Sequence, residues 1–196
     1  MREAEIIRRT AETDIRLKLD LDGAGKSEID TGCGFLNHML TLFARHGRFD
    51  LSVTCHGDTQ VDDHHSVEDI GICLGQAFAQ ALGDMGGINR YAHVVLPMDE
   101  ALILTAVDLS GRPHLSFGLE FPTEKIGACD TQLVEEFWLG FVRTAHVTVH
   151  IRQLAGSNSH HIAEGTFKSM GRSLRAACAV DPSLNGEIPS TKGTLV

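Results

Sequence analysis

The sequence predicts an α+β fold built from two duplicated β-β-α-β-α halves, with the helices sandwiched between two sheets. The chain has 196 residues, of which 42% are apolar and 22% charged, so it can bury a core of ordinary globular composition. It also repeats itself. "ETDIRLKLDLDG" at 12–23 returns as "EALILTAVDLSG" at 100–111, and the pattern His-His-x-x-Glu occurs at 64–68 and again at 160–164.

Each half begins with an expected strand followed by a turn. Apolar residues alternate through 12–23 and 100–111, which is typical of a strand with one buried face. The glycine that ends each segment predicts a hairpin turn. A second short strand is then expected around 27–30 in the first half and around 114–121 in the second.

A helix follows in each half. Apolar residues recur at helical spacing in "CGFLNHMLTLFARHG", residues 33–47, and in "TQLVEEFWLGFVRTA", residues 131–145. His38 and Glu136 occupy equivalent places in these two segments. The two helices therefore carry corresponding polar side chains on an otherwise apolar pattern.

A returning strand and a second helix complete each half. "FDLSVTC" and "AHVTVHI" are the expected strands, and each His-His-x-x-Glu opens a helix with one apolar stripe. The candidate N-caps are Asp62 or Asp63 in the first half and Ser157, Asn158 or Ser159 in the second. Each sheet should be covered on one face by two helices, and the halves should pack helix layer against helix layer.

No linker rich in Pro or Ser divides the chain, so we expect one domain over 1–196. Within it the repeat runs over about 5–90 and 91–185, and a tail follows at 186–196.

Charge and cysteine content limit the possible partners. The formal net charge of −9 argues against nucleic acid or an anionic membrane, because both attract basic surfaces. The five cysteines are odd in number and lack Cys-x-x-Cys spacing, so they suggest neither a disulfide framework nor a thiolate zinc site. The amino terminus has no apolar stretch of signal-peptide length, and the apolar run 101–107 is too short to span a bilayer. We expect a cytoplasmic protein.

The duplicated histidines predict metal sites. His64 and Glu68, like His160 and Glu164, stand four residues apart and therefore share one helix face. Adjacent helical residues are rotated by about 100°, so the second histidine of each pair should serve a different ion. His38 and Glu136 could each add a ligand. Imidazole and carboxylate donors without thiolate suit Mn, Fe or Zn. Three polar side chains could orient the rings from behind: Asp62, Asp63 and Ser159.

An anion site is also expected. Arg90, Arg112, Lys168 and Lys192 are scattered in the sequence, and such residues commonly do no more than solvate a surface. Lys168 differs because it lies four residues beyond Glu164 on the same helical face. A bound anion should therefore lie near a metal ion.

Other interpretations remain open at this point. A His-His pair at a helix start can be a cap or a solvated feature. Four other histidines, His56, His93, His114 and His146, have no repeated partner, and the role of His150 stays open. A dinuclear metallohydrolase or a metal-storage shell could use the same ligands. The basic residues favour an enzyme with an anionic substrate.

Several motifs together resemble the imidazoleglycerol-phosphate dehydratase family: "DDHHSVEDIG", "GINR", "DLSGRP", "HIRQLAGSNSHHIAEGTFK" and "IPSTKGTL". The resemblance runs from about residue 5 to 196 and is to the monofunctional form. It implies a fold like domain 2 of ribosomal protein S5, with four-stranded sheets. It also implies a 24-subunit homo-oligomer built from trimers, and two Mn²⁺ per subunit at subunit interfaces, with other divalent metals compatible.

The resemblance also implies which residues hold the metals. One ion would be bound by His64, His160, Glu164 and the residue at 136, and the other by His38, His65, Glu68 and His161. Many relatives have His where this chain has Glu136. A carboxylate can still bind the ion, but its charge and affinity differ.

The same resemblance implies the reaction and its residues. Water is removed from imidazole glycerol phosphate to give imidazole acetol phosphate in histidine biosynthesis, through a metal-bound imidazolate and a diazafulvene-like intermediate. Glu12 and Glu164 would transfer protons, His46 would pass a proton to the leaving hydroxyl, and Asp99 would hold substrate hydroxyls. The phosphate would be bound by Arg90, Arg112, Lys168, Ser190 and Lys192.

Overall fold

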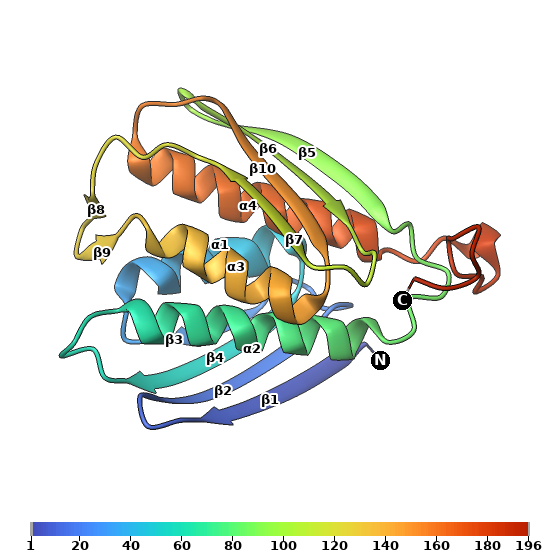
Figure 1. The fold of residues 1–196 in the computed structure, drawn as a ribbon, viewed down its shortest axis with the longest axis horizontal. Helices are drawn as coiled ribbons and strands as arrows, with labels where there is room; N and C mark the ends of the chain where they lie inside the picture. Colours follow the sequence, from blue (N-terminus) through green and yellow to red (C-terminus); the bar gives the residue numbers. More distant parts are fainter. Residues whose placement is uncertain (1, 196) are drawn as a thin grey trace.

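The structure, a computed structural model, describes residues 2–195 and contains two four-stranded sheets with four helices between them (Figure 1). The predicted α+β fold and its duplication are confirmed. The first half comprises β1 (Glu3–Arg9), β2 (Thr13–Asp20), β3 (Ser27–Asp30), α1 (Gly34–Gly47), β4 (Asp50–Gly57) and α2 (His64–Leu82). The second comprises β5 (Tyr91–Met98), β6 (Ala101–Asp108), β7 (His114–Gly118), α3 (Leu133–Ala145), β10 (Thr148–Ala155) and α4 (Ser159–Cys178). A small hairpin of β8 (Lys125–Ile126) and β9 (Cys129–Asp130) precedes α3, and the 3₁₀ helix η1 (Pro182–Leu184) follows α4.

Each half has one strand more than the sequence pattern indicates. The additional strands are β1 and β5, which lie at an outer edge of their sheets. In β1 only Ala4 is buried, so the strand lacks a clear apolar alternation. Ion pairs to β2 link the two strands instead, Glu5 with Arg16 and Arg9 with Asp14. Cross-strand charge pairs of this kind stabilise an edge strand without burial.

The expected hairpins between β2 and β3 and between β6 and β7 are wrong. The sheet orders are β1-β2-β4-β3 and β5-β6-β10-β7, so β4 and β10 lie between the strands that were expected to pair. β4 runs antiparallel to β2 and parallel to β3, and β10 does the same between β6 and β7. Both halves thus share one topology.

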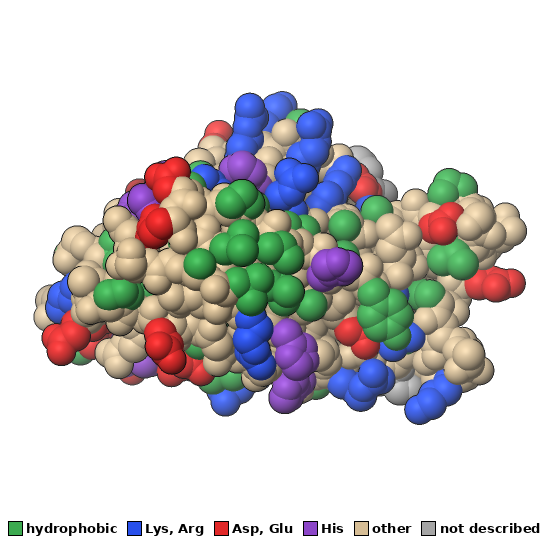
Figure 2. Space-filling view, turned by 90° about the horizontal axis from the view of Figure 1, so that it is seen from above, with side chains coloured by type: hydrophobic (Ala, Val, Ile, Leu, Met, Phe, Trp, Pro, Cys, Tyr) green, Lys and Arg blue, Asp and Glu red, His purple; other side chains and the backbone are tan. Residues whose placement is uncertain are grey.

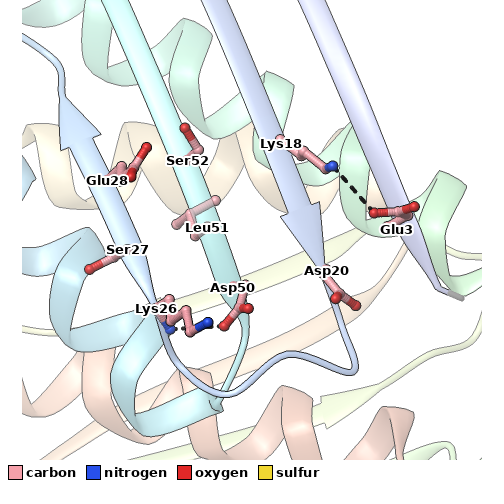
Figure 3. Close-up of a pocket in the computed structure, with 9 residues that line it drawn as sticks. All are labelled: Glu3, Lys18, Asp20, Lys26, Ser27, Glu28, Asp50, Leu51 and Ser52. Atoms are coloured by element: carbon pink, nitrogen blue, oxygen red, sulfur yellow. Dashed lines mark hydrogen bonds and ion pairs between the residues drawn. The ribbon is translucent and has the colours of Figure 1, made fainter.

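Asp50 explains why the glycine turn does not close a hairpin. Its Oδ1 accepts hydrogen bonds from the backbone N–H groups of Ala24, Gly25 and Lys26, at 2.8, 2.9 and 2.8 Å, and so holds the loop across the start of β4 (Figure 3). These backbone donors lower the pKa of Asp50. A Cβ at Gly23 would lie 2.4 Å from the Asp50 nitrogen, so this approach requires glycine.

The helices form the middle layer. α1 and α2 pack on the first sheet, α3 and α4 on the second, and the layers meet through α1 against α4 and α2 against α3 (Figure 1). Trp138 is fully buried where they meet. It is surrounded by Phe43, Phe137, Phe141 and Phe167, with ring centroids 4.9 to 6.1 Å away. This crossed packing decides which histidines lie together.

The outer face of the second sheet leaves large apolar side chains in solvent. Tyr91, Val95 and Leu154 are among the exposed residues of β5 and β10, and Figure 2, which views the molecule from that side, shows apolar side chains and histidines gathered there. Among the described residues, no helix combines the length and apolar character needed to cross a membrane.

Candidate functional site

The first candidate metal centre, the α1–α4 cluster, consists of His38, His160 and Glu164. Nε2 of His38 and Nε2 of His160 lie 3.5 and 3.2 Å from Oε2 of Glu164. One potential ligand atom from each residue lies within 4.8 Å of the others. The histidines are partly exposed whereas Glu164 is buried, so a bound ion would sit at the surface above a fixed carboxylate.

Lys168 completes the charge balance of this cluster. Its Nζ lies 2.5 Å from Oε1 of Glu164, one helical turn along α4. Burial, the largest single influence, opposes ionisation of Glu164, but the hydrogen bond and charge of Lys168 together with His160 and His38 outweigh it and lower the pKa of the carboxyl group. Glu164 is therefore a carboxylate at neutral pH, as a metal ligand must be.

His46, one of the predicted catalytic residues, lies in the last turn of α1 and interacts electrostatically with Lys168 and Arg172 on α4. Burial lowers its pKa, and the positive charges of Lys168 and Arg172 lower it further. The ring is therefore neutral at pH 7 and able to accept a proton.

The second candidate centre is at the start of α2. Nε2 of His64 lies 3.6 Å from Oε2 of Glu68 on the same helix face. Glu136 lies in α3, the helix that packs against α2. This arrangement corresponds by the internal repeat to His38 on α1 packing against α4.

Each neighbouring pair of histidines diverges, as the helix geometry predicts. The ring centroids of His64 and His65 are 6.3 Å apart with planes at 77°, and those of His160 and His161 are 6.4 Å apart at 87°. The second ring of each pair thus points away from its own centre.

Carboxylates hold the outward rings. Nδ1 of His65 lies 3.1 Å from both oxygens of Asp58, and its Nε2 is 3.7 Å from Glu12. Nδ1 of His161 lies 2.7 Å from Glu100, and its Nε2 is 3.9 Å from Asp99. Hydrogen bonds to Asp58 and Glu100 raise the pKa of the two rings, and His161 lowers that of Glu100 to about 2.

Four of the five predicted anion-binding residues line a cavity of about 720 Å³ beneath the C-terminal tail. Arg112, Ser190 and Lys192 are among its walls together with Arg90. Arg90 is buried, and its guanidinium group is hydrogen-bonded to other groups of the protein. Its Nε donates to Asp108 at 2.8 Å and its Nη1 to the carbonyl of Pro189 at 2.8 Å, so it holds the tail in place. The side chain of Arg112 is 64% exposed; its Nη2 lies 3.8 Å from Asp108 and its Nη1 donates to the carbonyl of Ser110 at 3.2 Å, so it faces the cavity with its outer surface in solvent.

Another hollow, on the outer face of the first sheet, is lined by Glu3, Lys18, Asp20, Lys26, Ser27, Glu28, Asp50, Leu51 and Ser52 (Figure 3). Lys18 is paired with Glu3 at 3.4 Å, and Asp50 binds the loop described above. None of the predicted site residues lines it.

Known proteins match this sequence over the whole chain. The family model described as imidazoleglycerol-phosphate dehydratase matches residues 31–174. The chain is 59% identical to the imidazoleglycerol-phosphate dehydratase of Xanthobacter autotrophicus over 195 residues, covering 100% of this chain and 99% of that protein. It is 58% identical to that of Methylorubrum extorquens, with 100% of both covered. The chain belongs to the imidazoleglycerol-phosphate dehydratase family.

Solved structures of the family have a similar fold. The crystal structure of imidazoleglycerol-phosphate dehydratase from Staphylococcus aureus matches with a TM-score of 0.84 and 40% identity, covering 91% of this chain and 99% of that one. The enzyme from Pyrococcus furiosus, in complex with (S)-C348, also gives a TM-score of 0.84, at 36% identity, covering 96% and 99%. Membership of the dehydratase family makes the chain a hydro-lyase.

Within one chain of this dehydratase, three of the predicted ligands meet, whereas the two expected ligand sets would span subunit interfaces and stay predictions. His38 lies with His160 and Glu164 rather than with His65 and Glu68. The physical reason is that α1 packs against α4, whereas the start of α2 is in the other helix pair. Lys168 likewise contacts Glu164 and does not line the cavity of Arg112 and Lys192.

The residues that orient the outward rings were also not foreseen. We expected Asp62, Asp63 or Ser159. Asp62 instead accepts from the backbone N–H of His64, and Ser159 bonds Thr123. Asp58 and Glu100 hold the rings. The internal repeat gives one indication that Glu100 belongs to the site, because Glu100 occupies the position in the second segment that Glu12 occupies in the first.

Proposed function

We propose that this protein dehydrates imidazole glycerol phosphate to imidazole acetol phosphate in histidine biosynthesis. The α1–α4 cluster carries the proposal, since two imidazoles and one buried carboxylate meet beside a lysine. An open N/O donor set of this kind suits a divalent ion that also binds substrate.

The imidazole and carboxylate chemistry of the predicted ligands suits two divalent ions per subunit, with Mn²⁺ the expected metal. His38, His160 and Glu164 would hold one, and His64, Glu68 and Glu136 the other. No thiolate is present in either set, which favours Mn²⁺ over softer ions. When bound, such an ion supplies a Lewis acid that favours loss of a proton from the substrate imidazole.

His65 and His161 support a proposal of assembly. Both rings point away from the centres of their own chain, and each is fixed by a carboxylate. We propose that they complete metal sites across subunit contacts of a homo-oligomer, a 24-mer built from trimers. The exposed Tyr91, Val95 and Leu154 provide apolar surface for subunit contacts.

Proton transfer would be divided among several side chains. Glu164 is ionised and buried, so it can accept a proton from substrate held above it. His46 is neutral at pH 7, so it could relay a proton to the leaving hydroxyl by taking up one proton at one ring nitrogen and releasing another from the second nitrogen. Glu12 and Asp99 lie beside the outward rings of His65 and His161, where they would act on substrate at an adjoining site.

The substrate phosphate would occupy the cavity beneath the tail. Arg112 and Lys192 supply positive charge and Ser190 a hydroxyl, in a chain whose net charge of −9 otherwise repels a phosphate. Arg90 would act mainly by fixing the tail through Pro189 and Asp108. A reducing compartment such as the cytoplasm suits the chain, because its five cysteines are free thiols.

One experiment tests the activity. Mn²⁺-loaded protein is incubated with imidazole glycerol phosphate, and the ketone product and released inorganic phosphate are both measured. We expect ketone without phosphate, its loss after chelation, and recovery when Mn²⁺ is restored. Phosphate release without ketone would indicate a metallohydrolase. If neither product forms, a metal-storage protein is the remaining interpretation. Glu164→Gln should abolish turnover, whereas Glu28→Gln, an exposed acid on β3, should not.

A further inference from the structure

Three side chains of ligand type meet outside both histidine centres. Sγ of Cys33, Sγ of Cys129 and a carboxylate oxygen of Asp63 all lie within 4.8 Å of one another. Cys33 is the N-cap of α1, Asp63 is the N-cap of α2, and Cys129 is in β9 just before α3. The cysteine spacing in the sequence suggests no thiolate site, because these side chains come together only in the folded chain.

Tertiary packing brings the sulfurs together. Cys33 precedes α1 and Cys129 precedes α3, but their offset of 96 differs from the 98 that separates the equivalent positions His38 and Glu136, so the two cysteines are not equivalent in the repeat. They meet because the starts of α1 and α2 and the segment before α3 lie at the same end of the helix layer.

The environment is that of a closed site rather than of surface thiols. Cys33 and Cys129 are only 4% and 5% exposed, and Asp63 is half-buried. The thiols also interact with each other: the hydrogen bond between them lowers the pKa of Cys33 and raises that of Cys129. With both sulfurs ionised beside the Asp63 carboxylate, the group would carry three negative charges, which a divalent cation would offset.

We propose that Cys33, Asp63 and Cys129 form a zinc site that is separate from the histidine centres. Thiolate ligands select Zn²⁺ over Mn²⁺, so the two kinds of site would discriminate between metals. Zinc–sulfur bonds of ~2.3 Å in a tetrahedron place two sulfurs ~3.8 Å apart, which small side-chain shifts can reach here. A water molecule would take the fourth position.

The site would link three segments that are distant in sequence. Zinc would tie the start of α1 and the start of α2 to the β8–β9 hairpin that precedes α3. Ligands that bind the folded chain but not the unfolded chain raise its stability. We therefore expect Zn²⁺ to raise the melting temperature of the chain.

Co²⁺ is the probe for the test, because cobalt bound to thiolate has a charge-transfer absorption that cobalt bound only by histidine and carboxylate lacks. The full-length protein is reduced, stripped of metal and titrated with Co²⁺. We expect the thiolate band in the wild type, its displacement by Zn²⁺, and its loss in Cys33→Ser and Cys129→Ser. Cys73→Ser, which changes another buried thiol, is the matched control and should keep the band.

Absence of the band in the reduced wild type, or its persistence in Cys33→Ser, would overturn the zinc site. Asp63→Asn gives a second measurement if a serine variant does not fold, because its side chain is only half-buried. It should weaken cobalt affinity ~10-fold or more, and unchanged affinity would contradict the assignment. The readout is spectroscopic, so its failure would leave the proposed dehydration unaffected.

Discussion

Nδ1 of His161 lies 2.7 Å from Oε2 of Glu100, a residue at the start of the neighbouring strand. Glu100 also accepts hydrogen bonds from the backbone N–H groups of Ser157 and Asn158, at 3.2 and 2.8 Å. One carboxylate therefore fixes both the ring of His161 and the loop that leads into α4. If His161 is a metal ligand, its free Nε2 is oriented by this contact.

Glu100→Gln should weaken metal binding without removing a ligand. A neutral amide holds the ring less firmly and makes it a weaker donor, and loss of such a partner typically costs 10–100-fold in affinity. Mn²⁺ titration followed calorimetrically measures the change. Glu28→Gln serves as the control, and equal affinity in the two variants would show that Glu100 has no positioning role.

Removal of the exposed charges in the tail cavity should impair substrate binding more than turnover. A charge-assisted hydrogen bond contributes about 1.5–3 kcal/mol, so Arg112→Ala and Lys192→Ala should each raise KM by ~10–100-fold with a smaller change in kcat. Steady-state kinetics with imidazole glycerol phosphate provides the measurement. Lys125→Ala removes an exposed charge from the β8–β9 hairpin instead and should change neither constant. A fall in kcat at constant KM would place these residues elsewhere in the reaction.

Gly71→Ala should destabilise the helix layer. A Cβ at this position of α2 would lie 2.3 Å from the carbonyl oxygen of Phe137 in α3, so the two helices would have to separate. Overpacking of this kind costs about 1–3 kcal/mol in the free energy of unfolding, despite the better helix propensity of alanine. Chemical denaturation measures the change.

Gly34→Ala is the matched control for this substitution. No atom lies within 4 Å of a Cβ built at Gly34, in the first position of α1. The variant should be neutral or slightly more stable. Equal destabilisation of both variants would contradict the close approach of α2 and α3.

Asp22→Asn should reduce stability at neutral pH but not in acid. Arg2 donates to both oxygens of Asp22, at 3.1 and 2.6 Å, and this hydrogen bond lowers the pKa of Asp22 below its ordinary value of 3.8. Since the folded pKa is the lower one, the stabilisation is complete above about pH 3.8 and disappears as pH falls through the folded value. The pair is partly exposed, so we expect a loss of roughly 0.5–1 kcal/mol.

Urea denaturation of the wild type and Asp22→Asn across the acid range measures this dependence. Asp14→Asn breaks the more exposed pair with Arg9 and should cost less. If the difference in the free energy of unfolding between wild type and Asp22→Asn increased towards low pH, the stabilising role of the Asp22 carboxylate would be contradicted.

The sequence by itself determined the features that depend on local geometry. Helical periodicity gave both histidine pairs their positions at helix starts, and the fixed rotation between adjacent residues gave His64 and His65 divergent rings. Repetition within the chain indicated the duplicated halves, and alternation indicated β2 and β6. The sequence pattern did not predict the edge strand β1, because this strand is stabilised by pairing with β2 and has no apolar pattern of its own.

Only the tertiary structure decided which residues act together. His38 joins Glu164 because α1 packs against α4, and Arg90 bonds to Asp108 and Pro189 because the tail packs against the segment that leads into β5. Cys33 and Cys129 meet because the start of α1 and the segment before α3 lie at the same end of the molecule. Such partnerships join positions as much as 126 residues apart, and they depend on how whole faces pack, which periodicity along the chain does not specify.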